Sequence, residues 1–268
     1  MCGIYLALSR KGLVPAPSNL LELLRNRGPD HVSQVVHEIK LDEGTHGPAT
    51  RTIQESVFIS CASSVLSLRG NAIVEQPATL AEELNGRKVS PFLCWNGEAW
   101  TFAGAAIQGN DSEHVLHLLS HVSDAALACQ SKFHEQAVAE ALASYSGPYA
   151  FAFYEPLLRR LYFGRDLLGR RSLLYRTTSE GELVLSSVPE GDGIQWTEVE
   201  TDGIHFVDLG IDHSNPAFRV QTTPYCFGSD SNPTERRRVC DQSGDKPQAR
   251  LTCTRPYVLW FSTKSCHL

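Results

Sequence analysis

Apolar and polar positions along the chain predict a series of short strands with a few amphipathic helices between them. Residues 3–9 form an almost continuous apolar run, which is typical of a buried strand. After Ser18, leucines at helical spacing predict a first helix that ends at Gly28-Pro29. Apolar and β-branched residues then predict strands over 57–68 and 92–95.

The next part of the pattern contains a turn and two helices. Asn96-Gly97 has the composition of a tight hairpin turn, which we expect to lead into a further strand at 99–102. Asp111-Ser112 are expected to cap a helix with an apolar face, and a second helix is predicted over 133–145. The strands predicted after it are residues 149–154, 160–164, 172–175, 183–187 and 203–207.

The order of these elements predicts the fold class. Strands, helices and strands follow one another in blocks, which favours an α+β fold of antiparallel sheets covered by helices. From about residue 227 the pattern fails, and the chain becomes polar and rich in Pro and Gly. We therefore expect a domain over residues 2–210, a linker over 211–227 and an irregular, disordered C-terminal tail over 228–268.

Composition and charge exclude several classes of protein. The chain has 268 residues, of which 42% are hydrophobic, and this is enough for one large domain. Its net charge of −6 argues against nucleic acid as a partner. No apolar run is long enough to cross a membrane, and no basic segment precedes the first apolar run as in a secretory signal. The eight cysteines are therefore expected to be reduced thiols in a cytoplasmic protein.

The most specific chemistry in the sequence lies at Cys2, directly after the initiator Met1. Removal of Met1, which processing permits before a side chain as small as Cys, would leave a thiol and a free α-amine on one residue. An α-amine has a pKa of about 7.7–8.0, so a fraction of it is neutral and can accept a proton from a nucleophile. Cysteine is also common as a small buried hydrophobe, so Cys2 alone does not decide between these interpretations.

Four further segments have a local structural explanation, and two of them also have a chemical one. Arg27–Asp30 is explained as a helix stop, and Asp111–Glu113 as a helix cap whose carboxylate can instead hold an ammonium group. Gly164–Arg171 is explained as a charged turn that braces strands. Asn96 and Gly97 are explained as a turn or as an oxyanion hole, in which a side-chain amide and a backbone N–H stabilise one negative oxygen.

Together and in this order, MCGI, RGPD, WNGE, DSE and GRDLLGRRSL resemble the class II, N-terminal nucleophile type of glutamine amidotransferase domain found at the front of asparagine synthetases. The segments LSLRG, WNGEAW, GPYAF and YFGRDLLGRRSLL are most similar to the divergent asparagine synthetase domain-containing family. The likeness covers roughly residues 2–210. It implies a four-layer α/β/β/α sandwich of two antiparallel sheets.

The resemblance also implies a reaction, with glutamine as a small-molecule substrate. Cys2 would attack the side-chain amide, and its own amine would relay the proton to the leaving ammonia. Asn96 Nδ2 and the Gly97 N–H would stabilise the oxyanion, and water would hydrolyse the resulting thioester to glutamate. Glu98 and Asp111 would bind the α-amino end of glutamine. Neither a cofactor nor a metal is implied for this reaction.

The sequence departs from this family at the substrate carboxylate. In asparagine synthetases an Arg grips that group, and the position that corresponds to it here, counted back from Gln76-Pro77, is Val65. A valine cannot supply the paired hydrogen bonds that a carboxylate favours. We expect Arg69 to replace the missing Arg as the group that binds the substrate carboxylate. Residues 65 and 69 would share a face of the predicted strand and lie about 13 Å from each other along it.

A second departure is the absence of the Ser-Gly-Gly-x-Asp-Ser loop of the synthetase half, which predicts a truncated chain that cannot make asparagine alone. Two hypotheses follow: a glutamine-hydrolysing domain related to asparagine biosynthesis, or a catalytically impaired binding or regulatory module. The remaining candidates are weak. The tail cysteines contain no C-x-x-C pair and predict no zinc site, while Cys61, Cys94 and Cys129 are expected to be inert core thiols.

Overall fold

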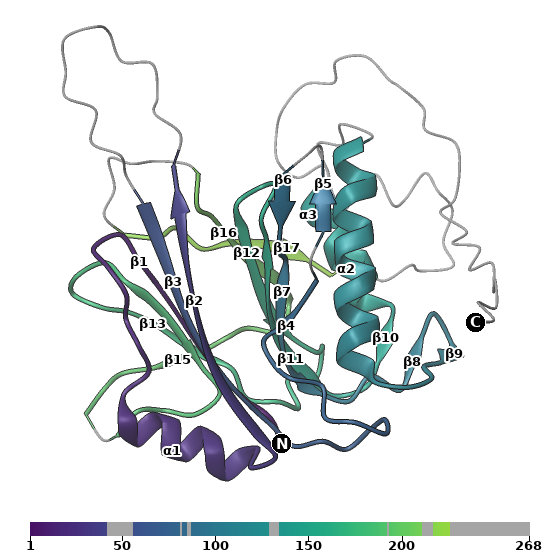
Figure 1. The fold of residues 1–268 in the computed structure, drawn as a ribbon, viewed down its shortest axis with the longest axis horizontal. Helices are drawn as coiled ribbons and strands as arrows, with labels where there is room; N and C mark the ends of the chain where they lie inside the picture. The colour runs from purple at the N-terminus through teal and green to yellow at the C-terminus, as the bar shows by residue number, and fades with distance from the viewer. Residues whose placement is uncertain are drawn as a thin grey trace, which may run out of the picture. The chain divides into compact units, whose positions relative to one another are not determined.

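The computed structural model describes residues 1–41, 56–80, 82–84, 87–128, 134–191, 193–210 and 217–225. Two six-stranded antiparallel sheets dominate it (Figure 1). The first, in spatial order, contains β15 (Thr197–Glu198), β13 (Leu174–Thr177), β14 (Leu183–Ser186), β1 (Gly3–Ser9), β3 (Ser56–Val65) and β2 (His31–Lys40). The second contains β17 (Gln221–Pro224), β16 (Gly203–Asp208), β12 (Arg160–Arg165), β11 (Tyr149–Glu155), β7 (Phe92–Gly97) and β4 (Ala78–Thr79).

Three helices and two small sheets complete the described fold. The helices are α1 (Ser18–Arg27), α2 (Asp111–Ala128) and α3 (His134–Ala143). The small strands are β5 (Glu82–Leu84) paired with β6 (Arg87–Val89), and β8 (Thr101–Phe102) between β9 (Ala105–Ala106) and β10 (Tyr145–Ser146). In Figure 1, α1 lies on the side of the first sheet, and α2 and α3 lie on the side of the second.

Side-chain alternation along the strands explains the layers. On β1, Ile4 and Leu6 belong to the core between the sheets, while Tyr5 belongs to the core beneath α1. On β7, Phe92 also faces the core between the sheets, while Trp95 faces the core under α2 and α3. Three apolar cores thus separate four layers, and the predicted α+β fold with an α/β/β/α sandwich is confirmed.

The same alternation directs two predicted site residues into the middle of the sandwich. Cys2 precedes β1 and continues the face that carries Ile4 and Leu6. Asn96 continues the face of β7 that carries Phe92 and Cys94. The thiol-bearing residue of one sheet and the amide-bearing residue of the other therefore both belong to the layer between the sheets.

Two local predictions are wrong. Asn96-Gly97 is not a hairpin turn, because β7 runs through Gly97, which pairs with Tyr149 of β11. A glycine is required there by close packing, since an added Cβ would lie 2.4 Å from the Pro148 carbonyl oxygen. The cap of α2 is Asn110 rather than Asp111 or Ser112: its Oδ1 accepts hydrogen bonds from the Ser112 and Glu113 N–H groups at 2.9 and 3.4 Å.

The domain also extends beyond residue 210. Residues 217–225 fall within the predicted linker, yet β17 pairs with β16 as the outer strand of the second sheet. Phe218 is buried in the core between the sheets, and Tyr225 in the core beneath the helices. This part of the segment belongs to the compact domain, while the predicted tail over 228–268 lies outside the described residues. In the described part of the chain, no helix has the length and apolar character needed to span a membrane.

Candidate active site

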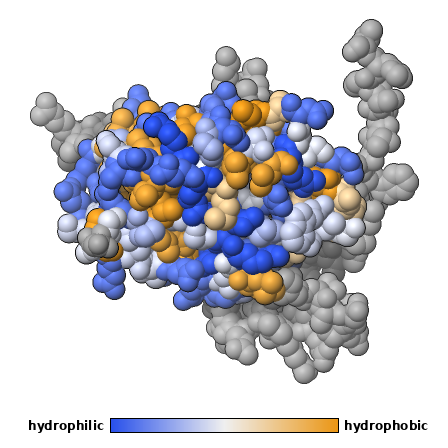
Figure 2. Space-filling model, turned by 90° about the horizontal axis from the view of Figure 1, so that it is seen from below, coloured by the Kyte–Doolittle hydropathy of each residue, from blue (hydrophilic) through white to orange (hydrophobic). Residues whose placement is uncertain are grey.

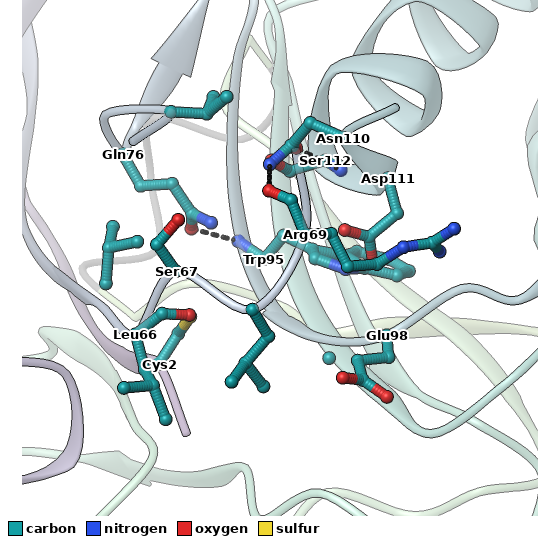
Figure 3. A pocket seen from close by; sticks show the side chains of 14 residues that line it. Cys2, Leu66, Ser67, Arg69, Gln76, Trp95, Glu98, Asn110, Asp111 and Ser112 are labelled. Carbon is teal, nitrogen blue, oxygen red and sulfur yellow. Dashed lines mark hydrogen bonds between the residues drawn. The ribbon is translucent and has the colours of Figure 1, made fainter. Parts of the chain in front are cut away.

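A pocket opens at the start of β1 and collects most of the predicted site residues (Figure 3). Its lining includes Cys2, Arg69, Gly97, Glu98 and Asp111. The other lining residues come from the segment after β3, from β7 and from the beginning of α2. Figure 2 shows the molecule from below, the side on which the N-terminus lies, and hydrophobic residues form separate patches there among hydrophilic ones.

Cys2 is the buried nucleophile candidate of this pocket. Its side chain is 9% exposed, and the thiol Sγ lies 3.8 Å from the Leu66 carbonyl oxygen, to which it donates. Burial raises the pKa of the Cys2 thiol, an effect that the positively charged N-terminus opposes. The thiol therefore needs a proton acceptor close by in order to react at neutral pH.

The N-terminus is held beside this thiol by Arg27. The Met1 ammonium donates to the Arg27 carbonyl oxygen at 2.9 Å, and Arg27 Nε donates to the Cys2 carbonyl oxygen at 3.2 Å. Partial burial lowers the pKa of the Met1 ammonium, and the Arg27 charge contributes in the same direction. These contacts hold the start of the chain beside the Cys2 side chain.

Gly28 and Asp30, which follow Arg27, shape the pocket wall. A Cβ on Gly28 would lie 2.6 Å from the backbone of Val65, so only glycine allows the end of α1 to approach β3 so closely. The Asp30 N–H donates to the Val65 carbonyl oxygen at 3.0 Å, and Asp30 Oδ2 accepts from the Ser67 N–H at 2.7 Å. Both contacts fix the turn that presents the Leu66 carbonyl to the thiol.

Asn96 is the predicted site residue that does not line the pocket. It is fully buried, and neither Oδ1 nor Nδ2 has a hydrogen-bond partner among the described residues. An unpaired buried amide is costly, and a catalytic role is one explanation for such a group. The amide lies next to Gly97 on the face of β7 that is directed toward the opposite sheet.

The backbone of β7 also provides a donor at Gly97. The Glu98 N–H donates to Pro148 on the β11 side, at 2.9 Å, whereas the Trp95 N–H donates to Gln76 Oε1 on the other side, at 2.7 Å. Donors alternate between the two edges of a strand, so the Gly97 N–H points to the Gln76 side. That edge is the wall of the pocket (Figure 3).

The two predicted acidic residues lie on the same side of the pocket. Asp111 is buried, and its Oδ2 accepts from Trp95 Nε1 at 2.9 Å and from the Ala99 N–H at 2.8 Å. Glu98 is half-exposed, and its Oε2 accepts from Trp100 Nε1 at 3.3 Å. Asp111 therefore fastens the start of α2 to the end of β7 and also places a negative charge at the pocket.

The prediction that Arg69 shares a strand face with Val65 is wrong, because β3 ends at Val65 and the chain leaves the sheet. The Arg69 guanidinium instead donates from Nη1 to the Ala99 carbonyl oxygen, and from Nη2 to that of Ile107 at 2.8 Å. Figure 3 shows this side chain passing Asp111, away from Cys2. Its role in the structure is to hold the main chain after β7.

Several lining residues were missed by the sequence reasoning. Gln76 fixes the edge of β7, and Ser67 and Asn110 contribute polar groups (Figure 3). Leu68 and Val74 contribute an apolar wall. Gln76 had a signal in the Gln-Pro pair, and Ser67 and Leu68 lie in the LSLRG segment, whereas Val74 and Asn110 lie outside the quoted motifs.

The Gly164–Arg171 segment braces the strands, as expected. Asp166 Oδ2 accepts from the Tyr149 N–H at 3.1 Å and from the Arg170 N–H at 3.0 Å. Arg165 Nε donates to the Arg171 carbonyl oxygen at 2.8 Å. These contacts tie the turn to the start of β11, opposite Gly97.

Comparison with known proteins shows what parts of the chain are similar to. Residues 97–191 match a family described as a glutamine amidotransferase domain. This segment is therefore similar to a glutamine amidotransferase domain. Asparagine synthetase domain-containing protein 1 of Bos taurus is 27% identical over 273 residues, covering 97% of this chain and 37% of that protein. The Mus musculus protein of the same name is 31% identical over 218 residues, covering 78% of this chain and 29% of that protein.

The chain spans about a third of the length of these two relatives. Among solved structures, the chain is similar to a glutamine phosphoribosylpyrophosphate amidotransferase from B. subtilis, complexed with ADP and GMP. The aligned region covers 82% of this chain and 49% of the amidotransferase chain. The two share 16% sequence identity, with a TM-score of 0.48.

The described residues contain no group of three or more His, Cys, Asp or Glu side chains placed to hold a metal ion. The tail cysteines Cys226, Cys240, Cys253 and Cys266 lie outside the described residues. Cys61 and Cys94 are buried in the core between the sheets, with their sulfur atoms 3.2 Å apart. Burial raises the pKa of the Cys61 thiol, which favours its unreactive protonated form.

Proposed function

We propose that this domain hydrolyses the side-chain amide of glutamine to glutamate and ammonia, with Cys2 as the nucleophile after removal of Met1. One observation carries the proposal. A buried thiol beside the N-terminus lines one pocket with Gly97, next to the Asn96 amide, which has no hydrogen-bond partner in the described part of the chain. Nucleophile, proton acceptor and oxyanion donors are the groups that amide hydrolysis through a thioester needs.

The steps follow from these groups. The Cys2 α-amine takes the thiol proton, and Sγ bonds to the carbon of the amide. Asn96 Nδ2 and the Gly97 N–H donate to the oxyanion that forms. When the C–N bond breaks, the ammonium of Cys2 returns its proton to the leaving ammonia. Water then attacks the thioester, which releases glutamate and restores the thiol.

Glu98 and Asp111 are proposed to bind the α-ammonium of glutamine, since both carboxylates line the pocket. All proton transfers take place on protein groups, so the reaction is proposed to need neither a cofactor nor a metal. The names of the curated relatives support a link to asparagine biosynthesis. We place the reaction in the cytoplasm.

The test is ammonia release from L-glutamine by the purified chain beside a Cys2→Ala variant. The variant is expected to fall to the uncatalysed rate, and Asn96→Ala should lower kcat by roughly 10²–10³-fold through loss of an oxyanion donor. Cys61→Ala removes a buried thiol outside the pocket and should retain activity. Equal background rates in the wild type and Cys2→Ala would rule out hydrolysis and favour the second hypothesis, a binding or regulatory module. Intact-mass analysis that found Met1 still attached would exclude the amine chemistry.

A further inference from the structure

We propose that the pocket recognises its glutamine through the α-ammonium and discriminates against a free α-carboxylate, so that the preferred substrate is a glutamine with a blocked carboxyl group. The N-terminal glutamine of a peptide has this chemistry. The inference rests on the proposed function, since it names the substrate class of the same site. The side-chain reaction is unchanged: water replaces ammonia on the carboxamide, and the blocked carboxyl group is not altered.

The charges that line the pocket favour a cation. The charged lining residues are Arg69, Glu98 and Asp111, so two carboxylates stand against one guanidinium. The two terminal nitrogens of that guanidinium already donate to main-chain carbonyl oxygens. Among the charged side chains of the lining, an arriving carboxylate would meet two carboxylates and a guanidinium with two of its five N–H donors already engaged, whereas an ammonium would meet two carboxylates.

The beginning of α2 does not compensate for this. A helix N-terminus attracts anions through its unpaired N–H groups. Here the Ser112 and Glu113 N–H groups donate to Asn110 Oδ1, and the His114 N–H donates to the Asn110 carbonyl oxygen at 3.4 Å. These three donors have acceptors within the helix cap, so they are not available to a carboxylate.

The remaining wall is apolar and partly open. Val65, Leu66, Leu68 and Val74 line it. Val65 is 5% exposed, so a carboxylate against it would lose water without gaining a partner. An uncharged ester or peptide group avoids that cost. Leu68 is 59% exposed, so a group that leaves the pocket past it reaches solvent. The uncharged side chains of Ser67 and Gln76 lie nearby and suit a carbonyl group (Figure 3).

Binding to the Cys2→Ala variant of the 268-residue chain tests the inference without turnover. Calorimetry compares L-glutamine, the dipeptide glutaminyl-glycine and N-acetylglutamine. Glutaminyl-glycine, which keeps the ammonium and lacks an adjacent carboxylate, is expected to bind at least ~10-fold more tightly than glutamine. N-acetylglutamine, which has the carboxylate and no ammonium, should bind most weakly. Glutamine binding as tightly as the dipeptide, or no binding of either, would overturn the proposal.

Turnover separates this inference from the proposed function. The wild type is expected to convert glutaminyl-glycine to glutamyl-glycine with a higher kcat/KM than it shows for glutamine, after subtraction of the Cys2→Ala rate. A higher kcat/KM for free glutamine overturns the inference and leaves hydrolysis intact. If neither amide is hydrolysed, the proposed function fails, and the binding order still decides the inference.

Two variants test the residues named. Val65→Arg would supply the missing cation and should raise glutamine affinity by about tenfold or more, with little gain for the dipeptide. If that variant does not fold, the wild-type comparison still decides. Glu98→Gln keeps the size of the side chain and should weaken binding of the dipeptide. Glu113→Gln on the exposed side of α2 removes the same charge outside the pocket lining and is its control.

Discussion

Cys2 is positioned by contacts from several parts of the chain. The Arg27 guanidinium holds its carbonyl group, the Leu66 carbonyl accepts from its thiol, and the Met1 amine is tied to the Arg27 carbonyl. Asn96, whose amide is unpaired within the described ranges, belongs to the same layer and comes from the other sheet. The chemistry of this site therefore depends on how a buried thiol gains and loses its proton.

Alkylation of Cys2 in the Met1-bearing chain is expected to keep accelerating at pH values where the rate of the unfolded chain has already reached its plateau. Burial raises the pKa of the thiol, so at a given alkaline pH the folded chain has less of the reactive thiolate than the unfolded chain. Peptide mapping after timed iodoacetamide treatment measures the rate at Cys2. The same chain unfolded in urea is the control, and its rate should reach half of its plateau near pH ~8.5. If the folded chain reached half of its plateau rate at a lower pH than this control, the raised pKa of the Cys2 thiol would be contradicted.

Contacts between elements fix the pocket wall. The end of α1 lies against the end of β3, and Asp30 holds the turn that follows β3. The guanidinium of Arg69 and the carboxylate of Asp111 then hold the chain after β7. A small change at one of these junctions moves the segment that faces the thiol.

Gly28→Ala should destabilise the fold by about 1–3 kcal/mol, because its Cβ would overlap the backbone of Val65 and Ser64. Urea unfolding measures the loss. Gly210→Ala is the matched control, since the nearest atom to its added Cβ is 3.5 Å away, and it should change stability by less than about 0.5 kcal/mol. Equal effects of the two substitutions would show that the α1–β3 junction is not tightly packed.

The core between the sheets connects distant parts of the molecule. β1 lies between β14 and β3, and residues from the start and end of the described domain share one core. Phe218 belongs to it, with the Arg10 guanidinium 5.1 Å from the centre of its ring. The stability of the whole sandwich therefore depends on residues after 210.

Phe218→Ala is expected to cost about 3–5 kcal/mol, because it removes a buried aromatic side chain from the core between the sheets. The difference in free energy of unfolding in urea checks this value. Arg219→Ala, at the exposed neighbouring position, should lie within about 0.5 kcal/mol of the wild type. A loss of under about 0.5 kcal/mol for Phe218→Ala would return this segment to the role of a linker.

The elements that the sequence predicted well carry strong local patterns. The strand over 3–9 has the bounds of β1, and the strand predicted at 149–154 lies within β11. The prediction of a hairpin turn at Asn96-Gly97 is wrong, because pairing with β11 overrides the turn preference of the two residues. The prediction of a helix cap at Asp111 is also wrong, because Asn110 provides the cap and frees Asp111 to accept from Trp95 and Ala99.

The sequence by itself determined the run of elements, the nucleophile candidate at Cys2 and the resemblance to an amidotransferase domain, because periodicity and motifs are local properties. Only the tertiary structure decided that Arg69 donates to the main chain at Ala99 and Ile107, and that Phe218 is part of the core. It also decided that Asn96 is buried without a partner among the described residues. These facts depend on contacts between residues far apart in the chain, and local sequence preferences do not encode such contacts.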